Sequence, residues 1–416
     1  MRTVLFIPPL RQMSGGLASI YAIAEDLCSL GHEIALSCPG EAPGLSDLLR
    51  QGNITRLPWE GISLAKSDLW VVPESWPNAI SPGVNSGART LVYAQSWNFF
   101  LTTLPAGVRW KQLPVHFLAV SRPVAWFMEK VLELSVLGVL PPAVNPVFSG
   151  PEGEGGRAAP RPGVAPENQR GNKNIVRVGW MPRKNRALAD QVRQVAETAL
   201  ERLERPVRVE WVPLQNMTQA ELAAALSTCP LFLSTAFPEG FGLTVVEAMA
   251  AGCVPVGFTG FGGWEYMRQA ALLSQPAASA ASQSSATAVS ATPQAFVPAA
   301  PAALWLHLPA VPAAPQPGLY ETSFSPALRA SVEFLLPPDK PEGGNGLYFH
   351  DGDVLGAGLG LAHAIELADK GGPVWEQLRA NAGVSAEFYS VAARRWRLES
   401  IWPALTGAEP LQSLVP

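Results

Sequence analysis

The sequence predicts an α/β protein built from two doubly wound parallel sheets that face each other across a cleft. Three observations support this prediction. Short apolar runs, such as residues 3–7 and, with one arginine, residues 175–179, are typical of strands in a parallel sheet. These runs are followed by a loop and then by a segment with helical apolar spacing, which is the βαβ pattern. The chain of 416 residues is long enough for two such domains, each with a sizeable core.

The first domain is expected to be Rossmann-like and to span residues 1–149. Its expected elements are a strand at 3–7, a loop with Ser14, Gly15 and Gly16, a helix at 17–30, and strands at 32–37, 69–72, 90–94 and 116–120. Gly31 is placed to end the helix, because glycine readily adopts the left-handed conformation found after a helix. The proline-rich residues 141–146 are expected to form a rigid exit from this domain.

A linker rich in glycine, proline and arginine is expected at residues 150–174, and a second Rossmann-like domain at 175–402. The expected elements of the second domain are strands at 175–179, 207–212, 231–234, 254–258 and 346–349, and helices at 186–203, 219–226, 354–367 and 386–401. Residues 274–342 are dominated by alanine, proline and serine and predict a largely disordered insertion within this domain. Residues 403–416 are expected to be a tail.

Composition excludes several classes of protein. A net charge of −4 gives no electrostatic reason to expect a nucleic-acid partner. Cys28, Cys38, Cys229 and Cys253 are scattered without a Cys-x-x-Cys pair, so free thiols are expected instead of disulfides or a zinc site. No apolar run approaches the ~20 residues of a membrane-spanning helix, and the first ten residues are too short an apolar run for a signal peptide. We therefore expect a cytoplasmic protein that needs no metal or cofactor.

Two glutamates bracket the most informative segment of the chain. Glu239 stands just before the turn Gly240-Phe241-Gly242-Leu243, and Glu247 lies just inside the helix expected to follow. This turn exposes backbone N–H groups at a helix N-terminus, where the helix dipole favours a phosphate. A helix start that already carries negative charge gains little from binding a phosphate, unless its acids bind hydroxyl groups of the ligand instead. A ligand with both phosphates and hydroxyls, such as a nucleotide sugar, fits this pattern.

The segment 238–252 resembles the E-x7-E motif of retaining glycosyltransferases of the GT-B fold, close to glycosyltransferase family four. The resemblance continues through 254–256, 262–265 and 345–353, but over residues 1–146 it is only topological. It implies that Glu239 is catalytic and holds the donor sugar near its reacting carbon, and that Glu247 holds the ribose hydroxyls. Gly240, Phe241, Gly242 and Leu243 would offer N–H groups to the donor phosphates.

The resemblance also implies a cationic pair that binds the donor diphosphate after the first strand of the second domain. Arg183 and Lys184 occupy that place, although they are adjacent in sequence where the family separates its two cations, and Arg186 is a possible substitute. Gly15 and Gly16 occupy the place of the family's N-terminal glycine loop. A plain tight turn is the alternative interpretation of these glycines, and a basic helix start is the alternative for the two cations.

Three features depart from the family pattern or imitate another one. A histidine that contacts the donor sugar in the family is missing, and Gln95 is the candidate to replace its hydrogen bond, whereas His116 is expected to be an ordinary strand residue. Asp351-Gly-Asp353 imitates a metal-binding motif but is better interpreted as a turn and N-cap. Trp264 lies near the expected site and is a candidate to line the sugar pocket.

The leading hypothesis is an enzyme of polysaccharide biosynthesis. It would be a retaining glycosyltransferase that moves a sugar from a nucleotide-diphosphate sugar to an acceptor hydroxyl of a glycan, a lipid-linked acceptor or a small molecule. Two alternatives stay open: a non-catalytic nucleotide-sugar-binding partner protein, and a nucleotide-sugar epimerase. Lipid-linked acceptors would bring peripheral membrane contact, although no basic amphipathic helix supports it.

Overall fold

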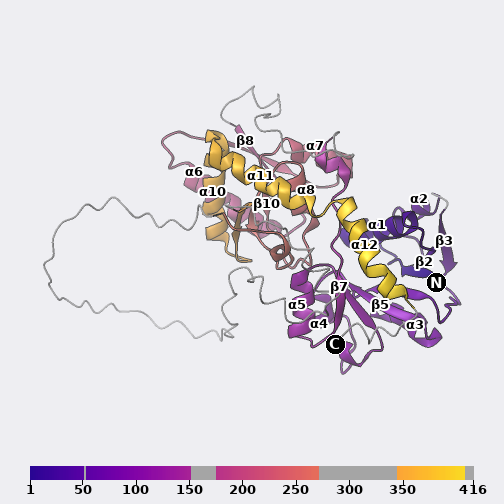
Figure 1. Cartoon of the computed structure of the whole chain (residues 1–416). Coiled ribbons are helices and arrows are strands. Elements are labelled where there is room, and N and C mark those ends of the chain that lie inside the picture. The colour runs from indigo at the N-terminus through magenta and orange to yellow at the C-terminus, as the bar shows by residue number, and fades with distance from the viewer. Residues whose placement is uncertain (51–52, 151–174, 271–343, 408–416) are drawn as a thin grey trace, which may run out of the picture.

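The computed structural model describes residues 1–50, 53–150, 175–270 and 344–407. Within these ranges the chain forms two α/β domains, each around one parallel sheet (Figure 1). The predicted fold class is thereby confirmed. The predicted insertion, and all of the predicted linker except Gly150, lie outside the described residues.

The sheet of the first domain has the strand order β3-β2-β1-β4-β5-β6-β7, and all its pairs are parallel. Its strands are β1 (Thr3–Phe6), β2 (Ile34–Cys38), β3 (Ile54–Pro58), β4 (Leu69–Pro73), β5 (Arg89–Ala94), β6 (His116–Ala119) and β7 (Val136–Val139). Its helices are α1 (Gly15–Ser29), α2 (Leu45–Arg50), α3 (Ser81–Ser86), α4 (Phe99–Thr102) and α5 (Arg122–Lys130). The order reverses between β1 and β4, so the loops after these strands diverge at the carboxyl edge of the sheet, which is where α/β sheets generally bind ligands.

The second sheet has the order β12-β11-β10-β8-β9, again with parallel pairs only. Its strands are β8 (Ile175–Trp180), β9 (Arg208–Pro213), β10 (Leu231–Ser234), β11 (Val254–Phe258) and β12 (Leu347–Phe349). Its helices are α6 (Arg186–Leu200), α7 (Gln219–Ser227), α8 (Leu243–Ala250), α10 (Val354–Lys370) and α11 (Pro373–Glu387). The order reverses between β8 and β10, which predicts where a ligand binds in this domain.

The C-terminal region differs from the prediction of one helix at 386–401. The structure has α11 and, after a break, α12 (Val391–Thr406). Ser390 caps α12 by accepting a hydrogen bond from the Ala393 N–H at 3.2 Å, which explains the break. The helix continues beyond residue 402 because Leu405 is buried, so residues 403–406 are helical and not part of a tail.

Helix α12 lies against the first domain, beside α1 (Figure 1). Asp26 on α1 accepts hydrogen bonds from Arg394 at 2.6 Å and from Arg395 at 2.9 Å. The indole of Trp402 is 1% exposed and donates to the Thr3 hydroxyl at 3.1 Å. The last helix therefore ties the end of the chain to the domain in which the chain begins.

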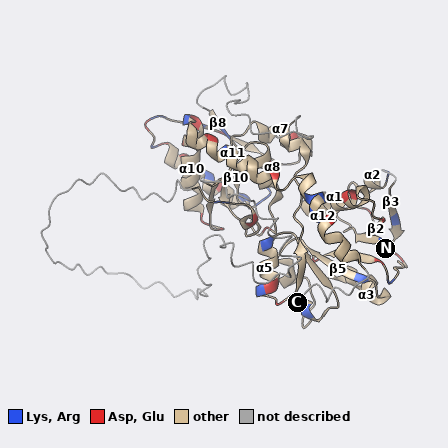
Figure 2. Cartoon of the chain, in the orientation of Figure 1, with Lys and Arg blue, Asp and Glu red and all other residues tan. Residues whose placement is uncertain are grey.

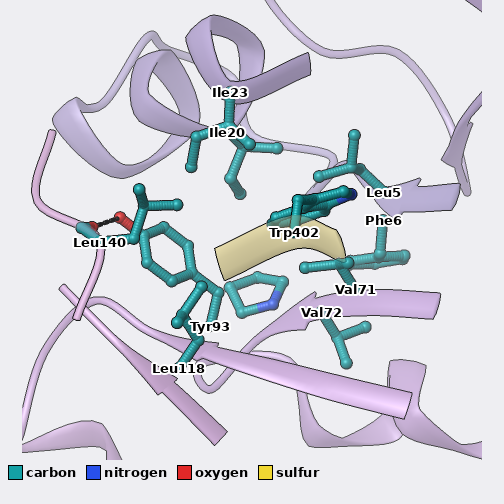
Figure 3. A pocket seen from close by; sticks show the side chains of 11 residues that line it. Leu5, Phe6, Ile20, Ile23, Val71, Val72, Tyr93, Leu118, Leu140 and Trp402 are labelled. Carbon is teal, nitrogen blue, oxygen red and sulfur yellow. Dashed lines mark hydrogen bonds between the residues drawn. The ribbon is translucent and has the colours of Figure 1, made fainter. Parts of the chain in front are cut away.

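A small cavity lies in the core of the first domain, between α1, Trp402 and the sheet (Figure 3). Its volume is about 10 Å³ and its lining is apolar, with Ile20 and Ile23 on one side and Val71 and Leu118 on the other. This space holds at most about one water molecule. It is a packing defect and not a substrate site.

Lys and Arg positions and Asp and Glu positions are distributed along the elements of both domains (Figure 2). Among the helices that the structure describes, none is long and apolar enough to cross a membrane.

Candidate functional site

The candidate site lies where the strand order of the second sheet reverses. Lys184 is in the loop after β8, and Glu239 is in the loop after β10. These two strands are neighbours in the sheet, so their carboxyl ends bring the two loops together. The ammonium group of Lys184 contacts a carboxylate oxygen of Glu239. The structure thus pairs two residues that the sequence assigned to different parts of a donor.

The two loops are locked together by side-chain hydrogen bonds to the backbone. The Asn185 amide donates to the carbonyl oxygens of Thr235 at 2.9 Å and Phe237 at 3.0 Å. The Thr235 hydroxyl donates to the Lys184 carbonyl at 2.9 Å. Asn185 itself has a φ of 54°, a conformation that Asn tolerates better than most residues. These hydrogen bonds fix the backbone that carries the Lys184 side chain.

The backbone of Glu239 is held by a third loop, after β11. Its N–H donates to the Gly260 carbonyl at 2.9 Å, and its carbonyl accepts from the Gly262 N–H at 3.1 Å. The Gly260 N–H in turn donates to Asp351 at 2.8 Å. Burial raises the pKa of Asp351 to about 6. The sequence pattern indicated only a turn at Asp351, whereas Asp353 caps α10 through the Gly356 N–H as predicted.

Helix α8 begins directly behind Glu239. Gly242 is its N-cap, with a φ of 80°, and no side chain caps the first turn. The N–H groups of Leu243 and Thr244 therefore have no acceptor within the helix and point beyond its N-terminus. The side chain of Phe241 is buried and its ring packs at 5.1 Å from the ring of Tyr266, so only the backbone of this residue is available for the predicted contact. The turn has the geometry of an anion-binding helix start.

Glu247 is a buried acid on the first two turns of α8. Its residue is 5% exposed, and no hydrogen bond or ion pair joins its carboxylate to another described residue, although the carboxylate oxygens keep a small accessible surface. Burial raises its pKa from 4.5 to about 7, and no neighbouring group lowers it. A carboxylate that is buried without a partner is costly, which favours a role in binding a ligand with hydroxyl donors.

The first domain approaches this site through the loop after β5. A Cβ on Gly240 would lie 1.9 Å from the Gln95 carbonyl oxygen, so the two domains touch where Gly240 stands. The Gln95 side chain donates to the Gly16 carbonyl at 2.9 Å, which joins the N-terminal glycine loop to the same contact. The Ser121 hydroxyl donates to the Gly240 carbonyl at 2.6 Å. Gly16, Gln95 and Gly240 therefore meet at one point.

Glu74 supports this contact from inside the first domain, and the sequence analysis missed it. Its carboxylate accepts the N–H groups of Gln95 and Ser96, each at 2.8 Å, and the residue is 1% exposed. Burial raises its pKa to about 7. The sequence does contain one indication of this role, since Glu74 is an acid directly after a buried apolar strand. The carboxyl ends of such strands are where parallel sheets place functional groups.

Within the described residues, the other candidate residues make no hydrogen bond or ion pair with Glu239 or Glu247. Arg183 is exposed, and Arg186 is exposed and 3.6 Å from Asp190 on its own helix. No other residue lies close to the position that a Cβ on Gly15 would occupy, and Gly15 begins α1. His116 is the first residue of β6, as expected of a strand residue, and burial lowers its pKa. No group of His, Cys, Asp and Glu that could hold a metal ion occurs among the residues described.

The fold and the position of this site define a class of protein. A glycosyltransferase from Rickettsia africae has a similar structure, with a TM-score of 0.55 and 12% identity over 98% of this chain and 99% of that one. Sucrose-phosphate synthase from Thermosynechococcus elongatus gives 0.53 at 12% identity, over 98% and 100% of the two chains. Anabaena HepE in complex with UDP and glucose gives 0.53 at 13%, over 97% and 99%. This chain has the GT-B fold.

Sequence similarity narrows the class for part of the chain. Residues 181–289 match the family model of glycosyl transferases group 1. A stretch of 53 residues is 42% identical to an alpha-1,6-glucosyltransferase from Actinobacillus pleuropneumoniae. That stretch spans 13% of this chain and only 16% of the relative's length. The matched family segment contains Lys184, Glu239 and Glu247, the residues that the geometry singles out.

Proposed function

We propose that this protein is a retaining glycosyltransferase that uses a nucleotide-diphosphate sugar as donor and a hydroxyl group of a glycan or lipid-linked molecule as acceptor. The observation that carries the proposal is the buried, unpartnered Glu247 beside the free N–H groups that begin α8. This pairing offers an acceptor for hydroxyls and donors for a phosphate within one turn of helix. A nucleotide diphosphate carries both groups.

The proposed roles follow from the charges around α8. The helix N-terminus and Lys184 bind the diphosphate, with exposed Arg183 as a second cation, and Glu247 accepts the ribose hydroxyls. Glu239 holds the donor sugar. Because Glu239 is paired with Lys184, the sugar and the diphosphate would meet at this ion pair.

The chemistry then consists of positioning and charge stabilisation. The acceptor hydroxyl attacks the anomeric carbon from the face that the diphosphate leaves, and the departing diphosphate takes the hydroxyl proton. Negative charge grows on the diphosphate as the bond breaks, where Lys184 and the first-turn N–H groups of α8 would stabilise it. The contact between Gly240 and Gln95 would hold the two substrates in one geometry.

A thermal-shift panel of UDP, GDP and ADP, alone and as their glucose and mannose conjugates, tests donor binding. A donor at about 100 times its Kd is expected to stabilise the protein by about 2.7 kcal/mol. Turnover of the stabilising donor is then measured with and without sugar acceptors. Glu239→Ala is expected to melt like the wild type and to lose transfer.

Asp190→Asn is the matched control, since Asp190 is an acid on α6 in the same domain with a half-exposed side chain. If the Glu239→Ala variant keeps full sugar-transfer activity, Glu239 does not have the proposed role. Donor binding without consumption would instead favour the nucleotide-sugar-binding partner, for which the glutamine in place of the family histidine is the supporting observation. Rearranged donor in the absence of acceptor would indicate an epimerase.

A further inference from the structure

Beside Glu239, five aromatic side chains that are not buried lie in ring-to-ring contact, and we call them the aromatic row; Trp97 also contacts the buried ring of Phe127 at 5.6 Å. The ring of Trp97 lies 6.1 Å from that of Phe237 and 5.8 Å from that of Phe261. Phe261 continues the row to Trp126 at 6.4 Å and to Trp264 at 5.0 Å. Trp97 and Trp126 belong to the first domain, and the other three to the second. The row therefore crosses the contact between the domains.

The row is open to solvent at both ends. Phe237 is 43% exposed and Trp126 is 39% exposed, whereas Trp97 and Phe261 between them are half-buried. Exposed aromatic rings from two domains beside a candidate catalytic acid are not explained by core packing. Glu239 forms a parallel bridge with Phe261 and follows Phe237 by two residues, so the row starts at the candidate reacting centre.

The backbone of Phe261 has a strained conformation, and this conformation places the Phe261 ring in the aromatic row. Its φ of 69° and ψ of −55° correspond to a γ-turn that is rare for residues with a side chain. Such a conformation costs about 1–3 kcal/mol and persists where its surroundings enforce it. Here the hydrogen bonds of Glu239 to Gly260 and Gly262 enforce it. The strain thus couples the position of the Phe261 ring to that of Glu239.

Polar groups accompany the rings. The indole N–H of Trp97 is buried and has no hydrogen-bond partner among the described residues. Gln95, Ser96 and Asn98 flank Trp97 in the sequence, and the Ser96 hydroxyl donates to the Asn98 amide oxygen. Aromatic faces beside amide and hydroxyl groups are complementary to a sugar ring, which presents C–H bonds on its faces and hydroxyls around its edge.

We propose that the aromatic row is the acceptor subsite and that it binds a sugar ring of a glycan acceptor by stacking. This inference rests on the proposed function and names the acceptor class for the same site. A ring stacked on Phe237 and Trp97 places its hydroxyls beside Glu239, where the donor sugar is proposed to react. Trp126, at the other end of the row, takes a sugar ring farther along the acceptor chain.

The competing occupant is a lipid surface. Trp126 shares a face of α5 with Lys130, four residues further along the helix, and such a face suits an anionic membrane. The Ser96 hydroxyl and the amides of Gln95 and Asn98 beside Trp97 favour the sugar, because a lipid chain offers no hydrogen-bond partner to them. The experiment therefore includes both occupants.

The test measures quenching of tryptophan fluorescence by maltotriose, cellotriose, mannotriose and chitotriose, with UDP bound. At least one of these is expected to give saturable quenching with the wild-type protein. Its Kd is expected to rise about threefold to tenfold in Trp126→Ala and in Phe237→Ala, since each substitution removes one stacking partner. Trp126→Phe keeps an aromatic face and is expected to restore most of the affinity. Trp396→Ala removes a tryptophan of similar exposure, 40%, from α12 and is expected to bind like the wild type.

Three results would overturn the inference. The first is an unchanged saccharide Kd in both alanine variants, and the second is saturable binding of none of the four trisaccharides. The third is binding to phosphatidylglycerol vesicles, lost in Trp126→Ala, without saccharide binding, which would make the row a membrane contact. Stabilisation of the wild type by UDP, measured separately, tests the proposed function. If UDP stabilises the protein and the row substitutions have no effect, only the acceptor inference fails.

Discussion

Replacing Glu247 with glutamine tests two separate effects of this buried acid: how much it destabilises the free protein, and how much it contributes to ligand binding. Burial raises the pKa of Glu247 from 4.5 to about 7. At a pH above 7 the folded protein must ionise a group that burial disfavours. The difference of two to three pKa units corresponds to about 3 kcal/mol. A glutamine at this position cannot ionise and does not incur this cost.

The sign of the effect follows from proton binding. Between about pH 4.5 and pH 7 the folded state keeps the Glu247 proton while the unfolded state releases it. The contribution of Glu247 to stability is therefore fully present below pH 4.5 and is lost as the pH rises through 7. Burial also raises the pKa of Glu74 and of Glu129 to about 7, so only the difference between variant and wild type isolates Glu247.

Urea unfolding at about pH 5 and about pH 9, followed by tryptophan fluorescence and circular dichroism, measures this difference. The loss of stability between the two pH values is expected to be smaller in Glu247→Gln by about 3 kcal/mol. The same variant is expected to bind UDP about 10-fold to 150-fold more weakly, because a hydrogen bond to a charged group is worth about 1.5–3 kcal/mol. An identical pH dependence in both proteins would refute the burial argument. Unchanged UDP affinity would refute the proposed ribose contact.

Three further predictions concern the contacts that hold the site and the domains. Gly240→Ala places a Cβ 1.9 Å from the Gln95 carbonyl oxygen, so the domains are expected to separate, with a larger radius of gyration in X-ray scattering and about 100-fold slower transfer. Trp402→Ala removes a fully buried indole, and urea unfolding is expected to show a loss of about 3–5 kcal/mol. Asp26→Asn leaves a buried arginine of α12 unpaired and is expected to cost about 3–5 kcal/mol, whereas Asp47→Asn, at an exposed ion pair, is expected to cost less than about 1 kcal/mol in the same assay.

The alternation of strands and helices was predictable because apolar periodicity reports burial directly. The strand predicted at 231–234 and the start of the helix predicted at 186 match β10 and α6. β3 (Ile54–Pro58) was missed because only its first residue is buried and its sequence includes the polar residues Thr55 and Arg56. Most of α11 was missed, because the predicted helix began only at residue 386. The predicted span also ran through the N-cap Ser390, since one N-cap serine carries little weight in a sequence pattern.

The site was predictable only where its residues lie close together in the sequence. Glu239 and Glu247 are eight residues apart and belong to one loop and one helix, so local patterns identify them. Glu74 and Asp351 act on backbone groups distant in the sequence, at Gln95 and Gly260, and only the tertiary structure brings these together. The exposure of Arg183 and the pairing of Lys184 with Glu239 are likewise consequences of tertiary packing.

Burial raises the pKa of three acids at this site, Glu74, Asp351 and Glu247. They differ in whether they accept hydrogen bonds from the protein, and this difference distinguishes an acid that positions a loop from one that binds a ligand. Glu74 accepts two backbone N–H groups and Asp351 accepts one, so each offsets part of its desolvation by holding a loop in place. Glu247 is less exposed than Asp351 and slightly more exposed than Glu74, and it accepts no hydrogen bond within the described residues. A buried acid with protein donors contributes to the architecture of the free protein. One without them is a net cost to the free protein, and that cost is offset when a ligand brings the missing hydroxyl donors.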